Sequence, residues 1–86
     1  MPADESLSLA IESLNRGEFS KAEELCREVL EDDPQNARAW HLRGISHAQQ
    51  TNLDEATKCF ENAIRYEPEN ATYHYNLGLA YKGLGQ

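Results

Sequence analysis

The sequence predicts an all-α protein: a solenoid of antiparallel helical hairpins, with five helices in one domain. Three observations predict this fold. First, the sequence matches itself when it is shifted so that Ala3 aligns with Ala37. Second, hydrophobic residues recur at helical spacing. Third, proline or glycine interrupts this pattern at regular places. With 86 residues, of which 40% are hydrophobic, the chain can build one small core.

The repeat is clearest at small residues and at residues that end helices. The same shift aligns Ala3 with Ala37 and Ala71, Ile11 with Ile45, Ala22 with Ala56, Pro34 with Pro68, Asn36 with Asn70, and Gly44 with Gly78. Geometry tolerates little variation at such positions, so the matches indicate a structural repeat.

The first two helices are expected at 4–16 and 19–32, separated by a break at 16–18. Ser20 is expected to cap the second helix, with Glu23 completing a capping box. Pro34 then ends it, because proline cannot continue the backbone hydrogen bonds of a helix.

The third helix is expected at 37–50, where Trp40, Gly44 and His47 recur at i, i+4 and i+7 and Asn36 can cap the start. At the break that follows, Thr51 replaces the turn glycine seen as Gly17 and Gly85. A β-branched residue disfavours positive φ, which leaves Asn52 as a candidate for that conformation.

The fourth and fifth helices are expected at 53–66 and 71–84, with Asp54 and Asn70 as their caps and Pro68 between them. Close packing is expected where small residues let backbones approach: Ala10, Ala22, Gly44, Ala56 and Gly78. Large side chains are expected to fill the remaining space, namely Leu25, Trp40, Phe60 and Tyr81.

These residues resemble the tetratricopeptide repeat (TPR), whose 34-residue pattern is W-x2-L-G-x2-Y…A-x3-F…P. The middle of the chain reads Trp40-x2-Arg43-Gly44-x2-His47, Ala56-x3-Phe60 and Pro68, and the final segment reads Tyr75-Asn76-Leu77-Gly78, Ala80-Tyr81 and Gly85. The resemblance implies one TPR-like domain over 1–86, a right-handed solenoid with repeats at 3–36 and 37–70 and a half repeat at 71–86. Arg43 stands where the family prefers leucine, so its stem is expected on the core and its charge outward.

The resemblance also implies that the first helix of each unit lines a concave groove. The matching positions are Leu7, Ile11, Leu14, Arg38, His41, Leu42, Ile45, Gln49, Thr72, Tyr75, Asn76, Leu79 and Lys82. Such an apolar trough suits an extended peptide or an amphipathic helix of a partner protein. The amide of Asn76 can pair with a peptide backbone or simply with water.

One subgroup of the family grips the C-terminal carboxylate of heat-shock chaperones with Lys, Arg and Asn at fixed groove positions. The matching residues here are Leu7, Ile11, Leu42, Thr72 and Asn76, and none carries a charge. A carboxylate would lie there unpaired, so binding of a chaperone tail is not expected.

The last helix raises an alternative function, self-assembly. Leu77, Tyr81 and Leu84 lie at i, i+4 and i+7 and would normally pack against a following helix. Either the chain is a fragment of a longer array, or copies associate through the helix at 71–84, or the end frays at Gly83 and Gly85.

Charge and targeting signals narrow the function class. The net charge is −7, and all of the excess lies in residues 1–34, either as a solvated outer face or as a surface that steers a basic partner. This balance argues against nucleic-acid binding. An acidic start and the lack of a long apolar run predict a protein without membrane insertion, in the cytoplasm.

Catalytic, cofactor and metal sites are not expected. His41, His47 and His74 show no ligand spacing, and His47 and His74 stand where the family packs aromatic residues, so they are expected in the core. Cys26 and Cys59 are expected to be buried thiols. We therefore expect a non-enzymatic interaction module without cofactors.

Overall fold

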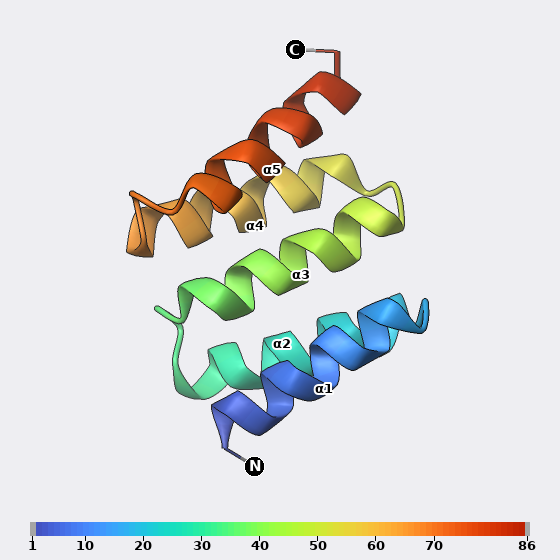
Figure 1. Cartoon of the computed structure of the whole chain (residues 1–86), viewed down its shortest axis with the longest axis vertical. Helices are drawn as coiled ribbons and strands as arrows, with labels where there is room; N and C mark the ends of the chain where they lie inside the picture. The colour runs from blue at the N-terminus through green and yellow to red at the C-terminus, as the bar shows by residue number, and fades with distance from the viewer. Residues whose placement is uncertain (1, 86) are drawn as a thin grey trace.

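The computed structural model describes residues 2–85 as five helices joined by short turns (Figure 1). The helices are α1 (Ala3–Asn15), α2 (Phe19–Asp32), α3 (Ala37–Gln49), α4 (Leu53–Tyr66) and α5 (Ala71–Gly83). Each expected helix is confirmed, with boundaries within one residue. The described residues contain no strand, and none of their helices is long and apolar enough to cross a bilayer.

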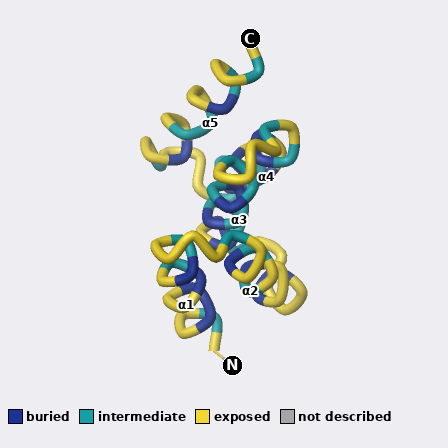
Figure 2. The backbone as a smooth tube through the Cα atoms, turned by 90° about the vertical axis from the view of Figure 1, so that its right-hand side faces the viewer, coloured by how far each residue is buried: buried dark blue, intermediate teal, exposed yellow. Residues whose placement is uncertain are grey.

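The helices stack in chain order, each packing on the next, and α1 also contacts α3. Figure 2 shows α1 and α5 toward one side of the stack and α2 and α4 toward the other, with α3 between them. The molecule thus consists of two hairpins, α1–α2 and α3–α4, followed by α5. This arrangement confirms an all-α solenoid.

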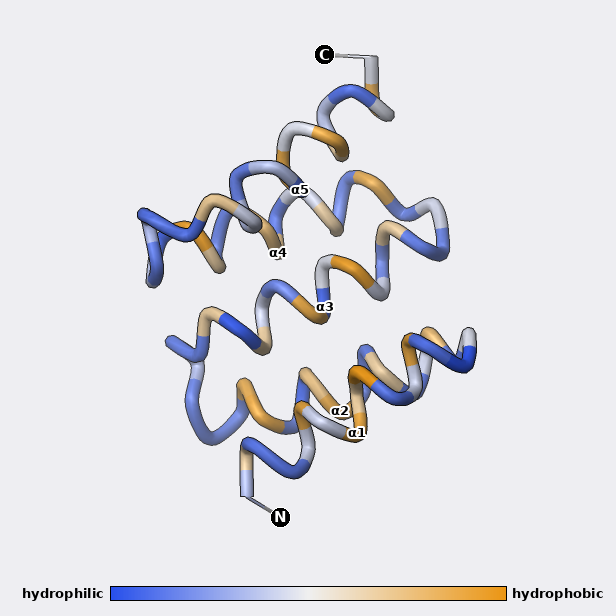
Figure 3. The backbone as a smooth tube through the Cα atoms, in the orientation of Figure 1, coloured by the Kyte–Doolittle hydropathy of each residue, from blue (hydrophilic) through white to orange (hydrophobic). Residues whose placement is uncertain are grey.

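Hydrophobic and hydrophilic residues alternate along the helices (Figure 3), and α2 and α4 have the most clearly separated apolar and polar faces. Ala10, Ala22 and Ala56 are fully buried where helices approach, and Phe60 fills the space beside Gly44 as expected. The expectation for Gly78 is wrong, because it is exposed and no described residue packs on it. Leu25, Trp40 and Tyr81 are only half-buried.

The helix caps divide into two kinds. Asn36 Oδ1 accepts from the amide of Ala39 at 3.0 Å, and Asn70 Oδ1 accepts from that of Thr72 at 3.1 Å, as expected. Ser20 and Asp54 are not caps, because α2 and α4 begin before them, at Phe19 and Leu53.

The starts of α2 and α4 are instead fixed by the turns that precede them. Glu18 N donates to Ser13 O at 2.8 Å, and Asn52 N donates to His47 O at 2.8 Å. Such a bond is part of a Schellman motif, which ends a helix. Here it also fixes the position of the residue that directly precedes the next helix.

The turn at Thr51 confirms the repeat but not the expected residue. Thr51 has φ 60°, beside 77° at Gly17 and 82° at Gly85, so these equivalent residues are all left-handed. Asn52 has φ −89° and does not take this role. The chain therefore keeps the turn geometry even where the residue is β-branched.

Arg43 joins the first hairpin to the second. Its Nε lies 3.2 Å from Glu23 Oε1, and its guanidinium lies 5.6 Å from the centre of the Trp40 ring. Only 23% of the Arg43 side chain is exposed, so its charge goes to a partner on α2 rather than outward as expected. Ser46 Oγ adds a second link, donating to Phe19 O at 2.9 Å.

Candidate functional site

Two hollows open beside α3, among the first helices of the repeats. The first hollow, between α1 and α3, has a volume of ≈ 360 Å³ and is lined by Ile11, Leu14, Asn15, Phe19, Leu42, Ile45 and Gln49. The second hollow, between α3 and α5, has a volume of ≈ 370 Å³ and is lined by Ile45, Ala48, Gln49, Leu53, Phe60, Asn76, Leu79 and Ala80. Ile45 and Gln49 border both, so the two hollows adjoin along one ridge of α3.

The lining of both hollows is apolar except for three amides, those of Asn15, Gln49 and Asn76. Apolar walls stabilise buried aliphatic or aromatic side chains, and amides can both donate to and accept from a peptide backbone. The hollows therefore suit a segment that inserts apolar side chains and keeps its backbone near the rim.

A hydrogen bond between α3 and α5 holds Asn76, which lines the second hollow. Asn76 Nδ2 lies 2.7 Å from His41 Nε2, and because an amide nitrogen only donates, this histidine nitrogen must accept. The His41 ring lies 4.5 Å from Tyr73 and 5.8 Å from Phe60, measured between ring centres. Burial lowers the pKa of His41, which favours the neutral ring that this bond requires.

Seven of the residues expected in the groove line the two hollows: Ile11, Leu14, Leu42, Ile45, Gln49, Asn76 and Leu79. His41 is half-buried and bonded to Asn76 but lines neither hollow. Arg38, Thr72, Tyr75 and Lys82 are exposed and also line neither. The expectation for Leu7 is wrong. It is 1% exposed, because it packs in the core that α1, α2 and α3 form together and cannot reach a ligand there.

Six lining residues were not expected in the groove: Asn15, Phe19, Ala48, Leu53, Phe60 and Ala80. Phe19 and Leu53 are the most informative of them. They are equivalent in the repeat, and each begins the second helix of its hairpin and reaches back into a hollow. Their alignment under the repeat shift was visible in the sequence. The resemblance directs attention to first helices only, so it could not assign them to the groove.

The residues expected to mediate self-association turn largely toward α4. Leu77 packs against a cluster of Ala56, Phe60 and Ala80, and the Tyr81 hydroxyl donates to Glu61 at 2.5 Å. Leu84 is half-buried just beyond α5. The large hydrophobic side chains that α5 exposes are instead Tyr75 and Leu79.

The histidines and cysteines have structural roles. His74 is exposed rather than in the core, and its Nε2 lies 2.7 Å from Pro68 O, as the equivalent Trp40 Nε1 donates to Pro34 O at 2.8 Å. His47 is largely buried near Glu23. Burial raises the pKa of the Cys26 thiol to about 12 and that of Cys59 to about 11, so neither is a ready nucleophile. Within residues 2–85 no cluster of potential metal ligands forms.

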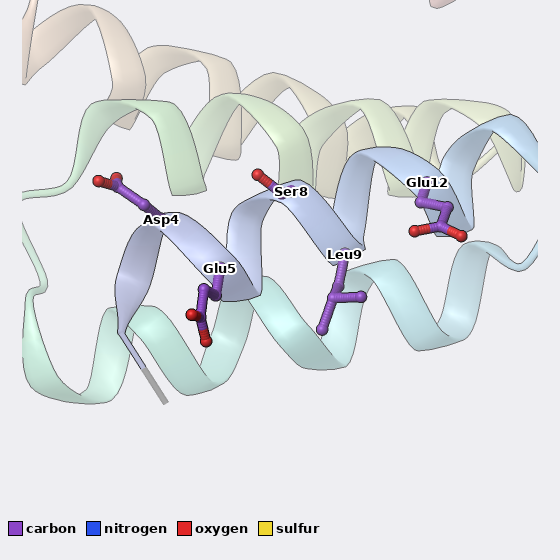
Figure 4. Close-up of a pocket in the computed structure, with 5 residues that line it drawn as sticks. All are labelled: Asp4, Glu5, Ser8, Leu9 and Glu12. Atoms are coloured by element: carbon purple, nitrogen blue, oxygen red, sulfur yellow. The ribbon is translucent and has the colours of Figure 1, made fainter.

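The outer face of α1 is acidic. Asp4, Glu5, Ser8, Leu9 and Glu12 line a shallow depression there, and Figure 4 shows that all five come from this one helix. The residues of α3 equivalent to Glu5, Ser8 and Glu12 are Ala39, Leu42 and Ser46, which are buried. Polar residues on α1 thus replace a packing face, which fits the interpretation of a solvated end of the stack.

Comparison with known proteins supports this architecture. A family model described as tetratricopeptide repeat matches residues 7–57, and one described as TPR repeat matches residues 47–85. The first TPR of Spaghetti (RPAP3), solved bound to the HSP90 peptide SRMEEVD, superposes with a TM-score of 0.93 at 21% identity, over 99% of this chain and 68% of that one. A mutant O-GlcNAc transferase of Thermobaculum terrenum gives 0.87 at 35% identity, over 91% and 15%.

Curated relatives are much longer proteins. Superkiller complex protein 3 of Homo sapiens is 33% identical over 84% of this chain, which spans 5% of that protein. The NatA auxiliary subunit N-alpha-acetyltransferase 16 of Homo sapiens is 30% identical over 73% of the chain, or 7% of its own length. Since a tetratricopeptide model matches more than half of the chain and the fold agrees, this protein belongs to the tetratricopeptide repeat family.

Proposed function

We propose that the chain is a non-enzymatic protein-interaction module, and that the two hollows beside α3 bind a segment of a partner protein. The observation that carries the proposal is the pair of adjoining apolar hollows, which share Ile45 and Gln49 and have amides at their rims. The relatives give supporting context: one is named for a complex, another is an auxiliary subunit, and one similar structure holds a peptide.

The spacing of the hollows defines the ligand. An α-helix with its side chains is about 10 Å across, so hollows on either side of α3 are separated by about that distance. A segment in the polyproline II conformation rises about 3.1 Å per residue and turns once every three residues, so side chains at i and i+3 share one face and span this distance. The ligand is an extended segment with apolar residues at i and i+3.

An acidic tail is not the proposed ligand. The lining amides can accept and donate hydrogen bonds but bring no positive charge, and Leu7, where a cation would be needed, is buried. Desolvating a carboxylate without a cationic partner is costly. The peptide SRMEEVD, which the Spaghetti (RPAP3) domain binds, should therefore not bind here.

Peptide display against the whole chain tests the proposal. We expect selected sequences to carry two apolar residues three apart and to lose binding to a Gln49→Trp variant, whose bulky indole would obstruct the ridge that the two hollows share. Gln50→Trp is the matched control, since Gln50 is also exposed but lines neither hollow. Selected peptides that bind Gln49→Trp as well as the original chain would contradict the proposal.

Self-assembly through residues 71–84 stays the second candidate function. The contacts of α5 favour it less than peptide binding in the hollows. Leu77 and Tyr81 already have partners on α4, so they offer little free apolar surface to another copy. Molar mass measured over a concentration series tests it. A dimer that Leu77→Ser dissociates without unfolding the chain would restore this candidate.

A further inference from the structure

The hydrogen bond between Asn76 and His41 fixes one end of an amide that lines the second hollow. Among residues 2–85 it is the one side-chain hydrogen bond that joins α3 to α5. An amide donates through its nitrogen and accepts through its oxygen, and the two atoms point in different directions. Which of them faces His41 therefore decides which of them is left for a ligand.

The oxygen of this amide is the atom left without a partner. Within the described residues the bond to His41 is the only one that the Asn76 side chain makes, so nothing there donates to Asn76 Oδ1. The only fully buried side-chain nitrogen or oxygen without a partner in residues 2–85 is His47 Nε2, so Asn76 Oδ1 is not fully buried. An accessible, unpartnered oxygen on a residue that lines the hollow is an acceptor for a donor group of a bound segment.

The imidazole of His41 holds the amide in this orientation. Its ring packs against Phe60 of α4 and Tyr73 of α5, and close packing on both rings limits its rotation. Its Nε2 therefore stays directed at Asn76. As long as Nε2 carries no proton it can only accept, so the nitrogen of the amide must face it and the oxygen must face elsewhere.

Protonation of His41 reverses this arrangement. Both ring nitrogens of a charged histidine donate, so Nε2 can no longer accept from Asn76 Nδ2. The amide must then turn and present Oδ1 to His41, which brings its nitrogen to the side where the oxygen had been. The hollow would then offer donors in place of an acceptor.

The surroundings of His41 keep its ring neutral at neutral pH. Phe60 does not titrate, and burial, followed by Glu67, raises the pKa of Tyr73 above 10.0, so neither ring is charged. Arg38, one turn earlier on α3, and Glu67 both act on Tyr73. Burial lowers the pKa of His41 itself, so the neutral ring that accepts from Asn76 is the form present at neutral pH.

We propose that His41 is a positioning residue that sets the hydrogen-bonding polarity of the second hollow. While it is neutral, it holds the Asn76 amide so that the oxygen accepts from an N–H group of the bound segment. Once it is protonated, the pair turns and this acceptor is lost. The inference rests on the proposed function of the hollows, and it adds that the ligand must donate an N–H at this point.

The free chain tests the arrangement without any ligand. Nuclear magnetic resonance of the isotope-labelled protein should show a scalar coupling between the Asn76 side-chain nitrogen and His41 Nε2 at neutral pH, because N–H···N hydrogen bonds transmit such couplings. The coupling should disappear in step with the titration of the His41 ring. A proton on Nε2 at neutral pH, or an Asn76 amide that ignores this titration, would overturn the proposal. His74→Gln is the matched control, since His74 is exposed and lines neither hollow, and it should leave the titration unchanged.

A proline-rich peptide tests the ligand. The probe is the peptide Pro-Leu-Pro-Pro-Leu-Pro, acetylated at its start and closed by a dimethylamide. It favours the polyproline II conformation, and its two leucines carry its only N–H groups. Binding to the whole chain is followed through the resonances of Ile45 and Leu79, which line the second hollow. An analogue that is N-methylated at both leucines should bind about tenfold more weakly, because it cannot donate to Asn76.

The same peptide should lose affinity as His41 becomes protonated. We expect binding about tenfold weaker at a pH at which the His41 ring is charged and the chain is still folded. His41→Phe separates positioning from packing, because phenylalanine keeps a ring beside Phe60 and Tyr73 but accepts no hydrogen bond. For this variant the peptide and its analogue should differ by less than about threefold, with no pH dependence in that range.

The possible failures of this inference and of the proposed function are distinct. No shift at Ile45 or Leu79 up to the solubility limit of the peptide would overturn the proposed function of this hollow, and the inference with it. Equal binding of the peptide and its analogue to the original chain would overturn the inference alone and leave the hollow as a binding site. A His41→Phe variant that keeps the full preference for the unmethylated peptide would show that His41 only packs.

Discussion

At the scale of single residues, Gly44 and Gly78 hold the same place in the repeat but have opposite surroundings. Gly44 is buried beneath Phe60, whereas a Cβ at Gly78 meets no described atom within 4 Å. Gly44→Ala should destabilise the chain by about 1–3 kcal/mol through overpacking. Gly78→Ala should stabilise it by about 0.5–1 kcal/mol through helix propensity. Urea unfolding of both variants checks this, and effects of the same sign would contradict it.

His41 should make stability depend on pH. Burial holds the pKa of folded His41 below its ordinary value of 6.5, so below about pH 6.5 the unfolded chain binds more protons and the folded state loses stability. The loss is at most about 1.4 kcal/mol per pH unit and stops below the pKa of the folded state. Urea unfolding at several pH values should show a shallower acid decline in His41→Gln. An identical decline would mean that other groups cause it.

Part of the candidate site was predictable from the sequence, namely the residues whose place in the repeat is enough to put them on the groove side of a helix. Ile11, Leu14, Ile45 and Gln49 line the hollows as their register implies. Leu7 was not predictable, because the register cannot tell a groove residue from one that the neighbouring helix covers. The engagement of Asn76 by His41 was also hidden, since the two residues lie 35 positions apart in the chain.

At the scale of helices and turns, three equivalent turns use the left-handed conformation, but one of them uses threonine. A β-branched residue in the left-handed conformation costs roughly 1–2 kcal/mol. This cost is partly offset because threonine loses less backbone entropy on folding than glycine does. Thr51→Gly should therefore stabilise the chain by about 0.5–1 kcal/mol, and Gly17→Thr should destabilise it by about as much. Thermal unfolding of both variants checks this. A lower melting temperature for Thr51→Gly would show that its hydroxyl bond to Gln50 O outweighs the strain.

The sequence indicated where each helix lies more reliably than how it starts. Asn36 and Asn70 cap α3 and α5 because each has an extended backbone itself, from which its side chain can reach the helix amides. Ser20 and Asp54 have good capping chemistry, but the tight turns before α2 and α4 start these helices earlier. Backbone bonds within a turn override side-chain preference, and single residues do not reveal them.

At the scale of the whole molecule, the order of the helices followed from the repeat, because a helical unit that cannot bury its own apolar face must stack on its neighbours. What sequence alone left open was the difference between the two ends. The outer face of α1 replaces buried positions with Glu5, Ser8 and Glu12, while α5 keeps an apolar stripe at Tyr75 and Leu79.

The contact between the two hairpins should depend on Glu23 more than on Arg43. Glu23 of α2 is 14% exposed and lies 3.2 Å from Arg43, 3.7 Å from Arg27 and 4.0 Å from His47, so removing its charge leaves several groups without an acidic partner. Glu23→Gln should cost about 1–2 kcal/mol of unfolding free energy. Arg43→Leu should cost less, because Glu23 keeps Arg27 and leucine restores apolar packing on Trp40. Urea unfolding of both single variants and the double variant measures their coupling. A larger loss for Arg43→Leu than for Glu23→Gln would show that the stacking of the guanidinium on Trp40, rather than the ion pair, holds the hairpins together.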